Sequence, residues 1–422
     1  MSSSKPCFEI PLGRKTIGAN FDGGSLSSDA GLLLLREVDK KLGLTKQLAG
    51  CIRDSRVRSR IKVTVAEMLC QRIMAIAAGY EDCNDHDTLK SDPMLKLASG
   101  RAPITGGDLA SQPTLSRFEN SISSTQLWRM EEVLLELFMS GHRGSKVRRL
   151  IIDADATDDP AHGQQQFEFF HGFYDCHCFL PLLVYVTADD GEQELVASVL
   201  RAGNVHAGHR LVSVLKRIVP RLATQFPDAQ IVFRGDAGMA LPAVYDFCED
   251  AGVDYVVSLA KNSRLLELGE GILRDARAIY EETGEKVRHF GEFLYAAQSW
   301  PRERRVVMKA EIVDKGENPR FVATNISDLA AADLYDFYID RGDVENRIKE
   351  LKDDLLSGRT SCHLFLANQF RLILHSAAFV LMQALRKLLS GTEFADAQVS
   401  TLRTRLLKVG ARVRETTRRI WL

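Results

Sequence analysis

Four carboxylates in this 422-residue sequence have surroundings typical of catalytic or metal-binding groups. Asp153 and Asp155 stand two positions apart in the apolar run LIIDADATDD, so on a strand both side chains point to the same face. Asp236 follows the apolar run QIVFRG, at a strand end of the kind where ligand-binding residues collect in open α/β sheets. An aspartate before Ala-Gly is equally typical of a simple turn. The fourth carboxylate, Glu345, lies in the charged stretch YIDRGDVENRIKELK.

The stretch around Glu345 predicts a helix with one functional face. Tyr338, Arg341, Glu345 and Lys352 would fall within about 60° of arc on a continuous helix. An ordinary ion-paired helix shows the same pattern, because charge-rich amphipathic helices are common. Gly342 is expected to weaken or bend this helix.

Three of these carboxylates could together promote phosphodiester chemistry. Two divalent ions about 3.5 to 4 Å apart neutralise charge on the attacking and leaving oxygens. Mg²⁺ prefers carboxylate oxygens, with water and phosphate completing its shell. Asp155, Asp236 and Glu345 would supply such ligands for two Mg²⁺ ions, for which Mn²⁺ can substitute. The tyrosine, arginine and lysine of the predicted helix would then hold phosphates.

The elements that must position these residues change in character along the chain. Residues 1–145 read as helical, with periodic apolar runs such as VAEMLCQRIMAIAAGY. From RRLIIDADATDDP onward, three strand-like segments are followed by helix, strand, helix and strand, which predicts a mixed α/β sheet of ribonuclease-H-like order. Further strand-like segments at about 284–326 predict an inserted β-sheet. The expected domains are therefore 1–145, 146–357 and a helical, basic region at 358–422.

Composition restricts the class of protein. Hydrophobic residues make up 45% and charged residues 26%, which argues against disorder and against membrane residence. No apolar run approaches the roughly 18 residues of a spanning helix, and the first residues lack the apolar core of a signal peptide, so a cytoplasmic protein is expected. The eight cysteines form no CxxC pair, DCHCF is too compact for a zinc cage, and GRKT lacks the upstream glycine of a phosphate-binding loop. No nucleotide cofactor is expected.

Although the net charge is only −1, basic residues are concentrated in two segments. The segment RDSRVRSRIK carries Arg53, Arg56, Arg58, Arg60 and Lys62 against one acid, Asp54, and nine bases face three acids from Arg386 onward. Both segments are either solvated helix faces or nucleic-acid contacts. The stretch GGDLASQPTLSRFENS could likewise be a turn and a recognition helix bearing Gln112, Ser116 and Arg117, or a helix packed within the domain.

The combined motifs resemble one family. The spacing Tyr338-x2-Arg341-x3-Glu345-x6-Lys352 resembles the Tyr-Arg-Glu-Lys signature of bacterial insertion-sequence DDE transposases. The segments DADATDDPAHGQQQFEFFHGFYDCHCFLPL, FRGDAG and FDGGSLSSDAGLLLLREVD resemble the group of insertion sequences known by the number thirteen-eighty. The resemblance covers nearly the whole chain. It favours Asp155 over Asp153 as the first catalytic aspartate, because that residue usually precedes a small residue and threonine in the family.

The resemblance implies an enzyme that binds transposon ends, cleaves them and joins the freed 3′ hydroxyl to target DNA. It implies a dimer in the end complex, a location on the nucleoid when the enzyme acts, and a DNA-end-binding role for residues 1–145. Its β insertion matches residues 284–326, where Trp300 is expected either to stack on a flipped base or to be a structural aromatic. Basic side chains expected to contact DNA are Arg302, Arg304, Arg305, Lys261 and Arg264.

Two alternatives remain at this point. One is a DNA-binding derivative without catalysis, and the other is a different ribonuclease-H-like nuclease, which would need neither the insertion nor the helical N-terminal domain. Similar proteins are expected to continue past RETTRRIWL, so a shortened C-terminal region is also expected.

Overall fold

The computed structural model describes residues 7–189 and 191–422 and divides into two compact units. The helical unit comprises Met1–Met130, Glu350–Arg359 and Ile373–Leu422, and the sheet unit comprises Glu131–Lys349 and Thr360–Leu372. Both units are discontinuous in sequence. The three continuous domains expected from the sequence stay a prediction.

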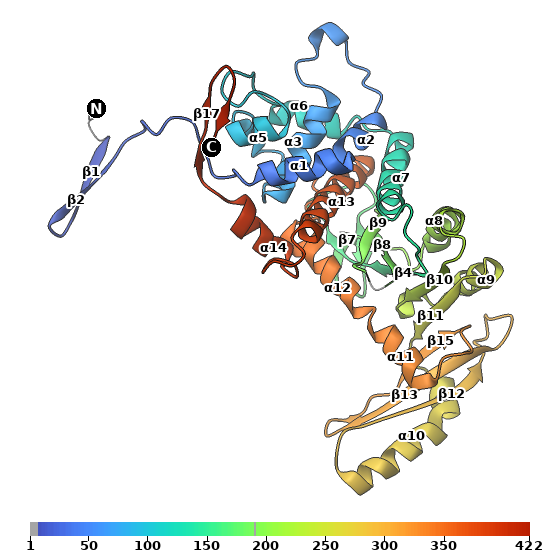
Figure 1. Ribbon diagram of the computed structural model, residues 1–422. Coiled ribbons are helices and arrows are strands. Elements are labelled where there is room, and N and C mark those ends of the chain that lie inside the picture. Colours follow the sequence, from blue (N-terminus) through green and yellow to red (C-terminus); the bar gives the residue numbers. More distant parts are fainter. Residues whose placement is uncertain (1–6, 190) are drawn as a thin grey trace. The chain divides into compact units, whose positions relative to one another are not determined.

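The helical unit consists mainly of short helices in its N-terminal part (Figure 1). These are α1 (Leu32–Leu42), α2 (Leu44–Gly50), the 3-10 turn η1 (Arg58–Arg60), α3 (Val65–Ala77), α4 (His86–Leu89), α5 (Pro93–Ala98) and α6 (Gln112–Glu119). Its C-terminal part has π-helices at Glu350–Asp354 and Arg403–Leu407, α14 (Val399–Leu402), and the two-residue strands β16 (Ala411–Arg412), β17 (Arg414–Glu415) and β18 (Ile420–Trp421). Helices α7 (Ser124–Gly141) and α13 (Phe365–Leu388) run from one unit into the other along the chain.

Helix α3 is the central element of the helical unit. It begins with a capping box, in which the Glu67 backbone N–H donates to the Thr64 hydroxyl and the Glu67 carboxylate accepts from the Thr64 N–H. The helix is buried on nearly every side, even at Arg72, whose guanidinium pairs with Glu119 of α6 at 2.8 Å. His86 is also buried, and its Nε2 atom lies 3.2 Å from the Arg72 guanidinium. The buried Arg72–Glu119 pair ties α6 to α3.

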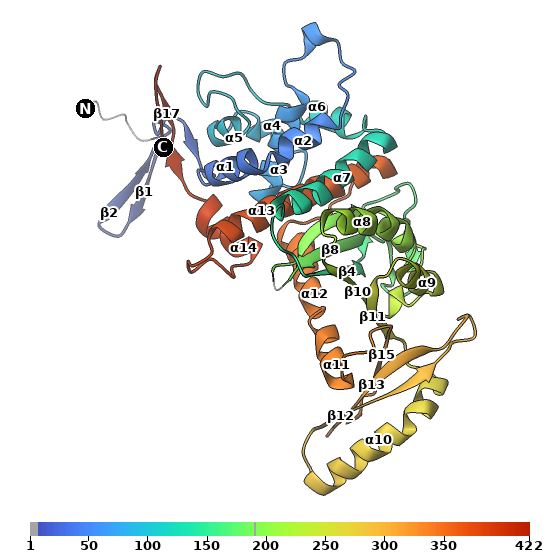
Figure 2. The same ribbon diagram turned by 45° about the vertical axis from the view of Figure 1, so that its right-hand side comes forward.

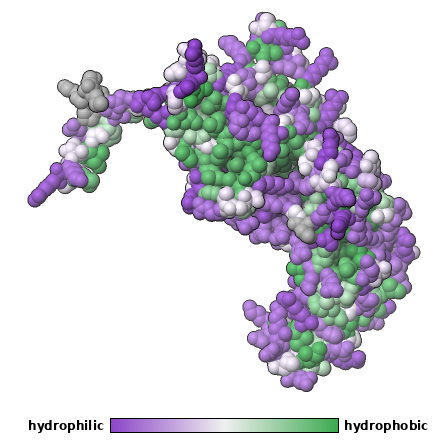
Figure 3. Space-filling view, viewed as in Figure 1, coloured by the Kyte–Doolittle hydropathy of each residue, from purple (hydrophilic) through white to green (hydrophobic). Residues whose placement is uncertain are grey.

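An N-terminal hairpin was not expected from the sequence. Strands β1 (Phe8–Leu12) and β2 (Lys15–Ala19) pair antiparallel and expose hydrophobic side chains to solvent (Figure 3). A third short strand, β3 (Leu26–Ser27), pairs with β16. The sequence gives no strong signal for this hairpin, because neither of its faces is buried and burial of one face is what produces the alternation typical of strands.

The sheet unit is organised around a nine-stranded mixed sheet. Its strand order is β12-β13-β15-β11-β10-β4-β8-β9, with β14 paired to β13. The strands are β4 (Arg149–Ala156), β8 (Leu182–Ala188), β9 (Glu194–Val199), β10 (Gln230–Gly235), β11 (Asp254–Leu259), β12 (Val287–Tyr295), β13 (Arg304–Val313), β14 (Gly316–Glu317) and β15 (Arg320–Thr324). Strand β10 pairs parallel with β4 and β11, and the other pairings in the sheet are antiparallel. A mixed α/β fold, as expected, is confirmed.

The segment expected to form an inserted β-sheet does form strands, and these extend the central sheet. Strand β15 pairs antiparallel with both β11 and β13, so the hydrogen-bonding is continuous from β12 to β9. The sequence also gave no expectation of α10 (Ser263–Thr283). Gly269 and Gly271 weaken the helical signal there. A side chain at Gly269 would collide with the Met308 sulfur, so this glycine allows α10 to approach β13 closely.

The two faces of the sheet are covered by different helices. Residues Leu150, Ile152 and Ala154 of β4 belong to one core with α7, α8 (Leu211–Gln225), α9 (Pro242–Asp250) and α10. Helices α8 and α9 lie beside β4 and β10 in both ribbon views (Figure 2). On the opposite face, α11 (Ala331–Ile339) packs through Leu334 and Tyr335 on the sheet. Because side chains alternate along a strand, Asp153 and Asp155 point to the face covered by α11.

Helix α13 is the only element in the described residues long and apolar enough to cross a membrane, with a mean hydropathy of 1.3. Of the window that passes this test, 83% is buried inside the protein, as in the core helix of a globular fold. This helix is therefore weak evidence for a membrane span.

Candidate active site

Asp155 and Asp236 occupy the ends of neighbouring parallel strands. In the register of β4 and β10, Asp153 lies opposite Arg234 and Ala154 lies opposite Gly235. Asp155 and Asp236 are the next residues on each strand. Asp236 then caps the 3-10 turn η2 (Ala237–Met239), and its carboxylate accepts from the Gly238 N–H at 3.0 Å. The strand pairing therefore places the two carboxylates at one edge of the sheet.

The Asp155 carboxylate is in an environment that disfavours its charge. Burial, and next the negative charge of Asp236, raise the pKa of Asp155 to about 6, although Arg341 opposes this shift. One Asp155 oxygen accepts from the Ala156 N–H at 2.8 Å, and the other accepts from the Arg341 guanidinium at 3.0 Å. The edge therefore carries more negative charge than its single arginine compensates.

Arg341 links this edge to Glu345. Arg341 is 9% exposed, and its guanidinium pairs with Asp155 and lies 3.6 Å from the Glu345 carboxylate. The Tyr338 ring centroid is 5.9 Å from the same guanidinium. Tyr338, Arg341 and Glu345 therefore converge in space, as the spacing in the sequence suggested.

The helix that carries these residues is interrupted. Helix α11 ends at Ile339, α12 runs over Gly342–Lys349, and a π-helix follows at Glu350–Asp354. The break directly before Gly342 agrees with the bend expected there. The expectation of one continuous helical face from 338 to 352 is wrong, and Lys352 belongs to the helical unit.

Asp153 has a different partner from Asp155. Its two oxygens accept from the Arg234 guanidinium at 2.8 and 2.9 Å, and Gln193 donates to it at 3.1 Å. Asp153 is fully buried, and Arg234 also donates to the Phe337 carbonyl of α11. The Asp153–Arg234 pair joins β4 to β10, Arg234 joins β10 to α11, and Gln193 adds the segment before β9, so Asp153 has a supporting role beneath the edge.

The donor set fits a divalent cation in part. The repulsion that raises the pKa of Asp155 is what a cation shared with Asp236 would relieve. Glu345 is 58% exposed on its side chain and contacts Arg341 rather than a second carboxylate. Within residues 7–189 and 191–422, no group of three His, Cys, Asp or Glu side chains is arranged to hold a metal ion. The two aspartates fit such an ion, and the placement of Glu345 does not complete the set.

An aromatic hollow adjoins Asp236 and was not expected from the sequence. Its volume is about 370 Å³, and its lining includes His171, Phe173, Tyr174 and His206. His171 ends β6 (Phe169–His171), Phe173 and Tyr174 lie in the loop to β7 (Cys176–Phe179), and His206 lies after β9. Phe173 is 84% exposed and its ring contacts Tyr174 edge-on. The run FEFFHGFYDCHCF offered a signal, since three phenylalanines precede a turn that itself contains Phe173 and Tyr174.

A family model described as "Transposase DDE domain group 1" matches residues 10–422. The chain belongs to this DDE transposase family. No curated protein matches the chain. The family indicates an enzyme that acts on DNA, which agrees with a cluster of carboxylates and an arginine at one edge of a mixed sheet.

The other residues of this transposase predicted to contact DNA differ in burial and in ion pairing. Trp300 packs edge-on against Tyr245 and Tyr295, and Arg304 lies over its ring. The Arg304 side chain is 2% exposed and pairs with Glu249 and Asp246, as expected of a structural ion pair. Lys261 and Arg264 are exposed near the start of α10, where Arg264 pairs with Glu267. The surroundings favour the last two over Arg304 as phosphate contacts.

Proposed function

We propose that this transposase binds the terminal inverted repeats of an insertion sequence, cleaves the DNA and transfers the strand to target DNA. The observation that carries the proposal is the pairing of Asp155 and Asp236 at one sheet edge with Arg341, which links Asp155 to Glu345. The Tyr-Arg-Glu-Lys spacing and the resemblance to the thirteen-eighty group support the same activity. Asp155, Asp236 and Glu345 are the proposed catalytic residues.

Two Mg²⁺ ions, or Mn²⁺ in their place, are the proposed cofactors, and they would neutralise charge on the scissile phosphate. The two aspartates would hold them, because their mutual repulsion leaves the edge short of positive charge. Glu345 would become a third ligand after its ion pair with Arg341 breaks. The proposed fold of this part of the chain is ribonuclease-H-like, with the strands β12 to β15 as its insertion.

Arg341 has a specific role in this proposal. It now neutralises part of the charge of Asp155 and Glu345. A DNA phosphate at the edge would offer the guanidinium a bidentate partner, and arginine forms such pairs readily. Exchange of a carboxylate for a phosphate would free Glu345 to approach the aspartates when DNA is present. Tyr338, whose ring adjoins Arg341, would contact the same DNA strand.

The proposed partners are the transposon ends and target DNA, bound by a dimer in the end complex. Residues 1–145 are proposed to recognise the ends. Lys352, Lys261 and Arg264 are proposed phosphate contacts, and Trp300 and Arg304 would support the insertion. The protein is proposed to act in the cytoplasm on the nucleoid without a nucleotide cofactor.

A divalent-dependent cleavage assay tests the proposal. The substrate is DNA that carries the inverted repeats flanking the reading frame, and the reaction is run with Mg²⁺, with Mn²⁺ and with chelator. We expect nicking at the repeat ends with either ion, and none for Asp236→Asn. Cleavage that persists in Asp236→Asn would contradict the assignment of this aspartate.

A DNA-binding derivative without catalysis is the second candidate. The exposure of the Glu345 side chain, whose ion pair is with Arg341, favours it. This candidate predicts specific binding of the repeats with no cleavage by the wild-type protein at any divalent-ion concentration. The same assay, read together with a binding measurement, separates the two functions.

A further inference from the structure

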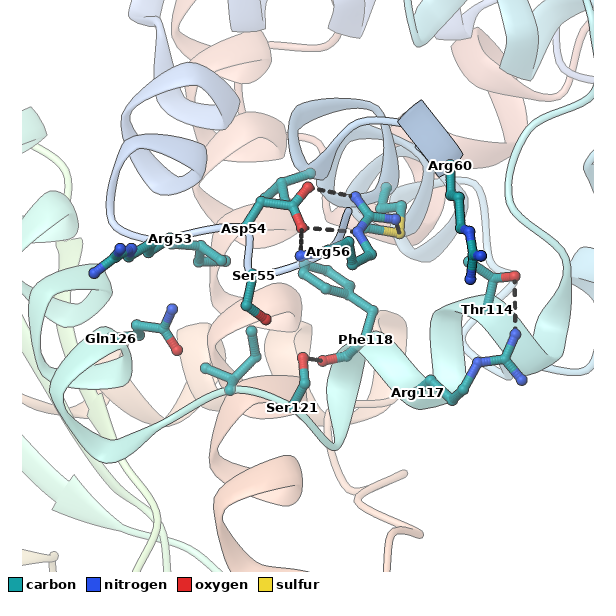
Figure 4. Close-up of a pocket in the computed structure, with 14 residues that line it drawn as sticks. Arg53, Asp54, Ser55, Arg56, Arg60, Thr114, Arg117, Phe118, Ser121 and Gln126 are labelled. Atoms are coloured by element: carbon teal, nitrogen blue, oxygen red, sulfur yellow. Dashed lines mark hydrogen bonds and ion pairs between the residues drawn. The ribbon is translucent and has the colours of Figure 1, made fainter. Parts of the chain in front are cut away.

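A second hollow lies in the helical unit, between the loop before α3 and helix α6 (Figure 4). Its volume is about 440 Å³, within the range of about 300–1,000 Å³ for small-ligand sites. Two sequence segments that had no evident connection line it together. Arg53, Arg56 and Arg60 come from the basic segment before α3, and Arg117 comes from the predicted recognition helix.

The hollow has a surplus of positive charge. Its one carboxylate, Asp54, forms a two-pronged pair with Arg56 at 2.7 and 2.9 Å. In the described part of the chain, Arg53 and Arg60 have no ion pair, and Arg117 contacts only the Thr114 hydroxyl at 3.5 Å. These three exposed guanidiniums are therefore available to an anion.

The basic groups flank an apolar wall. In the close-up, Arg60 and Arg117 lie near Thr114 at one end, and Arg53 lies near Gln126 at the other (Figure 4). Phe118 lies between these ends, and the remaining apolar lining is Ile52, Val65, Met68 and Ile122. A site for phosphate alone would have no use for such a wall, whereas a nucleotide has both an anionic and an apolar part.

We propose that this hollow binds an unstacked nucleotide of a DNA strand. The phosphates on either side of the nucleotide contact Arg53 at one end and Arg60 and Arg117 at the other, and the base lies against the Phe118 wall. Stacked bases of a duplex cannot enter a concave site, so a single-stranded or distorted segment is the ligand. The inference rests on the proposed function, since it assigns one DNA contact of the transposase to residues outside the catalytic edge.

The binding experiment uses the full chain and fluorescein-labelled thymidine oligonucleotide, with anisotropy measured over a series of salt concentrations. Arg60→Gln and Arg117→Gln are each expected to weaken binding about tenfold, because each removes a charge-assisted contact. Each should also reduce the salt slope by up to about 0.7, the value for one phosphate of a single strand, because the two arginines share one phosphate. Arg58→Gln is the matched control, since Arg58 is exposed in the same segment but does not line the hollow.

The apolar wall has its own test. Ser121→Phe places a neutral ring in the hollow, because Ser121 is an exposed lining residue. It should weaken binding without changing the salt slope. Thymidine monophosphate should compete with the oligonucleotide for the wild-type protein, and inorganic phosphate should compete far less. Equal competition by phosphate would show a simple anion site and overturn the nucleotide assignment.

Further outcomes test whether the hollow is the nucleotide site. If Arg58→Gln weakens binding as much as Arg60→Gln, the attraction is diffuse and the hollow is not the site. If wild-type protein cleaves repeat DNA but the pocket variants bind the oligonucleotide normally, the inference fails and the proposed function stands. If the wild-type protein neither binds nor cleaves DNA, both fail. Arg58→Gln should bind and cleave as the wild type does, whereas Asp155→Asn should not cleave at any concentration.

Discussion

Replacing Asp155 by Asn should stabilise the folded protein while abolishing cleavage. The pKa of Asp155 is raised from 3.8 to about 6 by burial and by the charge of Asp236. A carboxyl whose pKa is higher in the folded state binds its proton more tightly there, so its contribution to stability is present at low pH and is lost as pH rises from about 4 to about 6. A difference of roughly 2.2 pH units corresponds to about 3 kcal/mol at neutral pH. The Asp155 side chain is 14% exposed, so solvent screens this effect only weakly.

The gain is expected to be smaller than this figure because Asp155→Asn also removes a charge partner of Arg341. Urea unfolding at a pH near 4.5 and at a pH near 7.5 measures the difference. Wild-type protein should be more stable relative to the variant at the lower pH, and the variant should be more stable by about 1 to 3 kcal/mol at the higher pH. Added Mg²⁺ should stabilise the wild-type protein more than the variant.

Asp328→Asn is the control, since Asp328 is an exposed carboxylate of the sheet unit. It should leave both unfolding curves unchanged within about 0.5 kcal/mol. A variant at Asp155 that is less stable than wild type at neutral pH would refute the reasoning, because it would mean that the Arg341 ion pair outweighs burial and the charge of Asp236.

The remaining predictions use the same assays. Glu345→Gln should bind repeat DNA with unchanged affinity and salt dependence but lose cleavage, whereas loss of binding and folding would identify Glu345 as a structural partner of Arg341. Lys352→Ala should weaken end binding and lower the salt slope by up to about one unit, with cleavage recovered at high protein concentration; an unchanged slope would remove Lys352 from the contacts. Asp153→Asn should cost about 3 to 5 kcal/mol of stability by leaving the buried Arg234 without its charge partner, and retained Mg²⁺-dependent cleavage by the folded fraction would confirm a supporting role. Gly238→Ala should slow cleavage with only a small loss of stability. A Cβ there would lie 2.7 Å from the Ala207 Cβ and 3.1 Å from the Asp236 carboxylate, so it would displace the Asp236 side chain. An unchanged cleavage rate would show that the loop adapts.

Local pattern in the sequence predicted most of the sheet unit's regular elements. Apolar runs of strand length bounded by turn residues indicated β4, β8, β10 and β11, and these strands lie where expected. Such runs are readable because a buried strand must be apolar almost throughout. The helix α10 and the hairpin β1–β2 were missed, since glycines weakened one pattern and solvent exposure weakened the other.

These patterns do not predict which strands pair with each other. Alternation says which side chains share a face, but it does not say which strand is the neighbour. The sequence therefore could not show that β15 joins β11 and merges the expected insertion with the central sheet. It likewise could not show that the basic segment before α3 and helix α6 line one hollow.

The residue types and spacing determined by themselves that Asp153 and Asp155 share a strand face, and that Tyr338, Arg341 and Glu345 could meet. Tertiary structure decided the roles of the two aspartates. The register of β4 and β10 sets Asp153 opposite Arg234, whose charge it neutralises, and leaves Asp155 to face Asp236 and Arg341. Two carboxylates with the same local sequence context thus differ because burial and charged neighbours come from strands and helices distant in the chain, and these set the free energy of each ionised group.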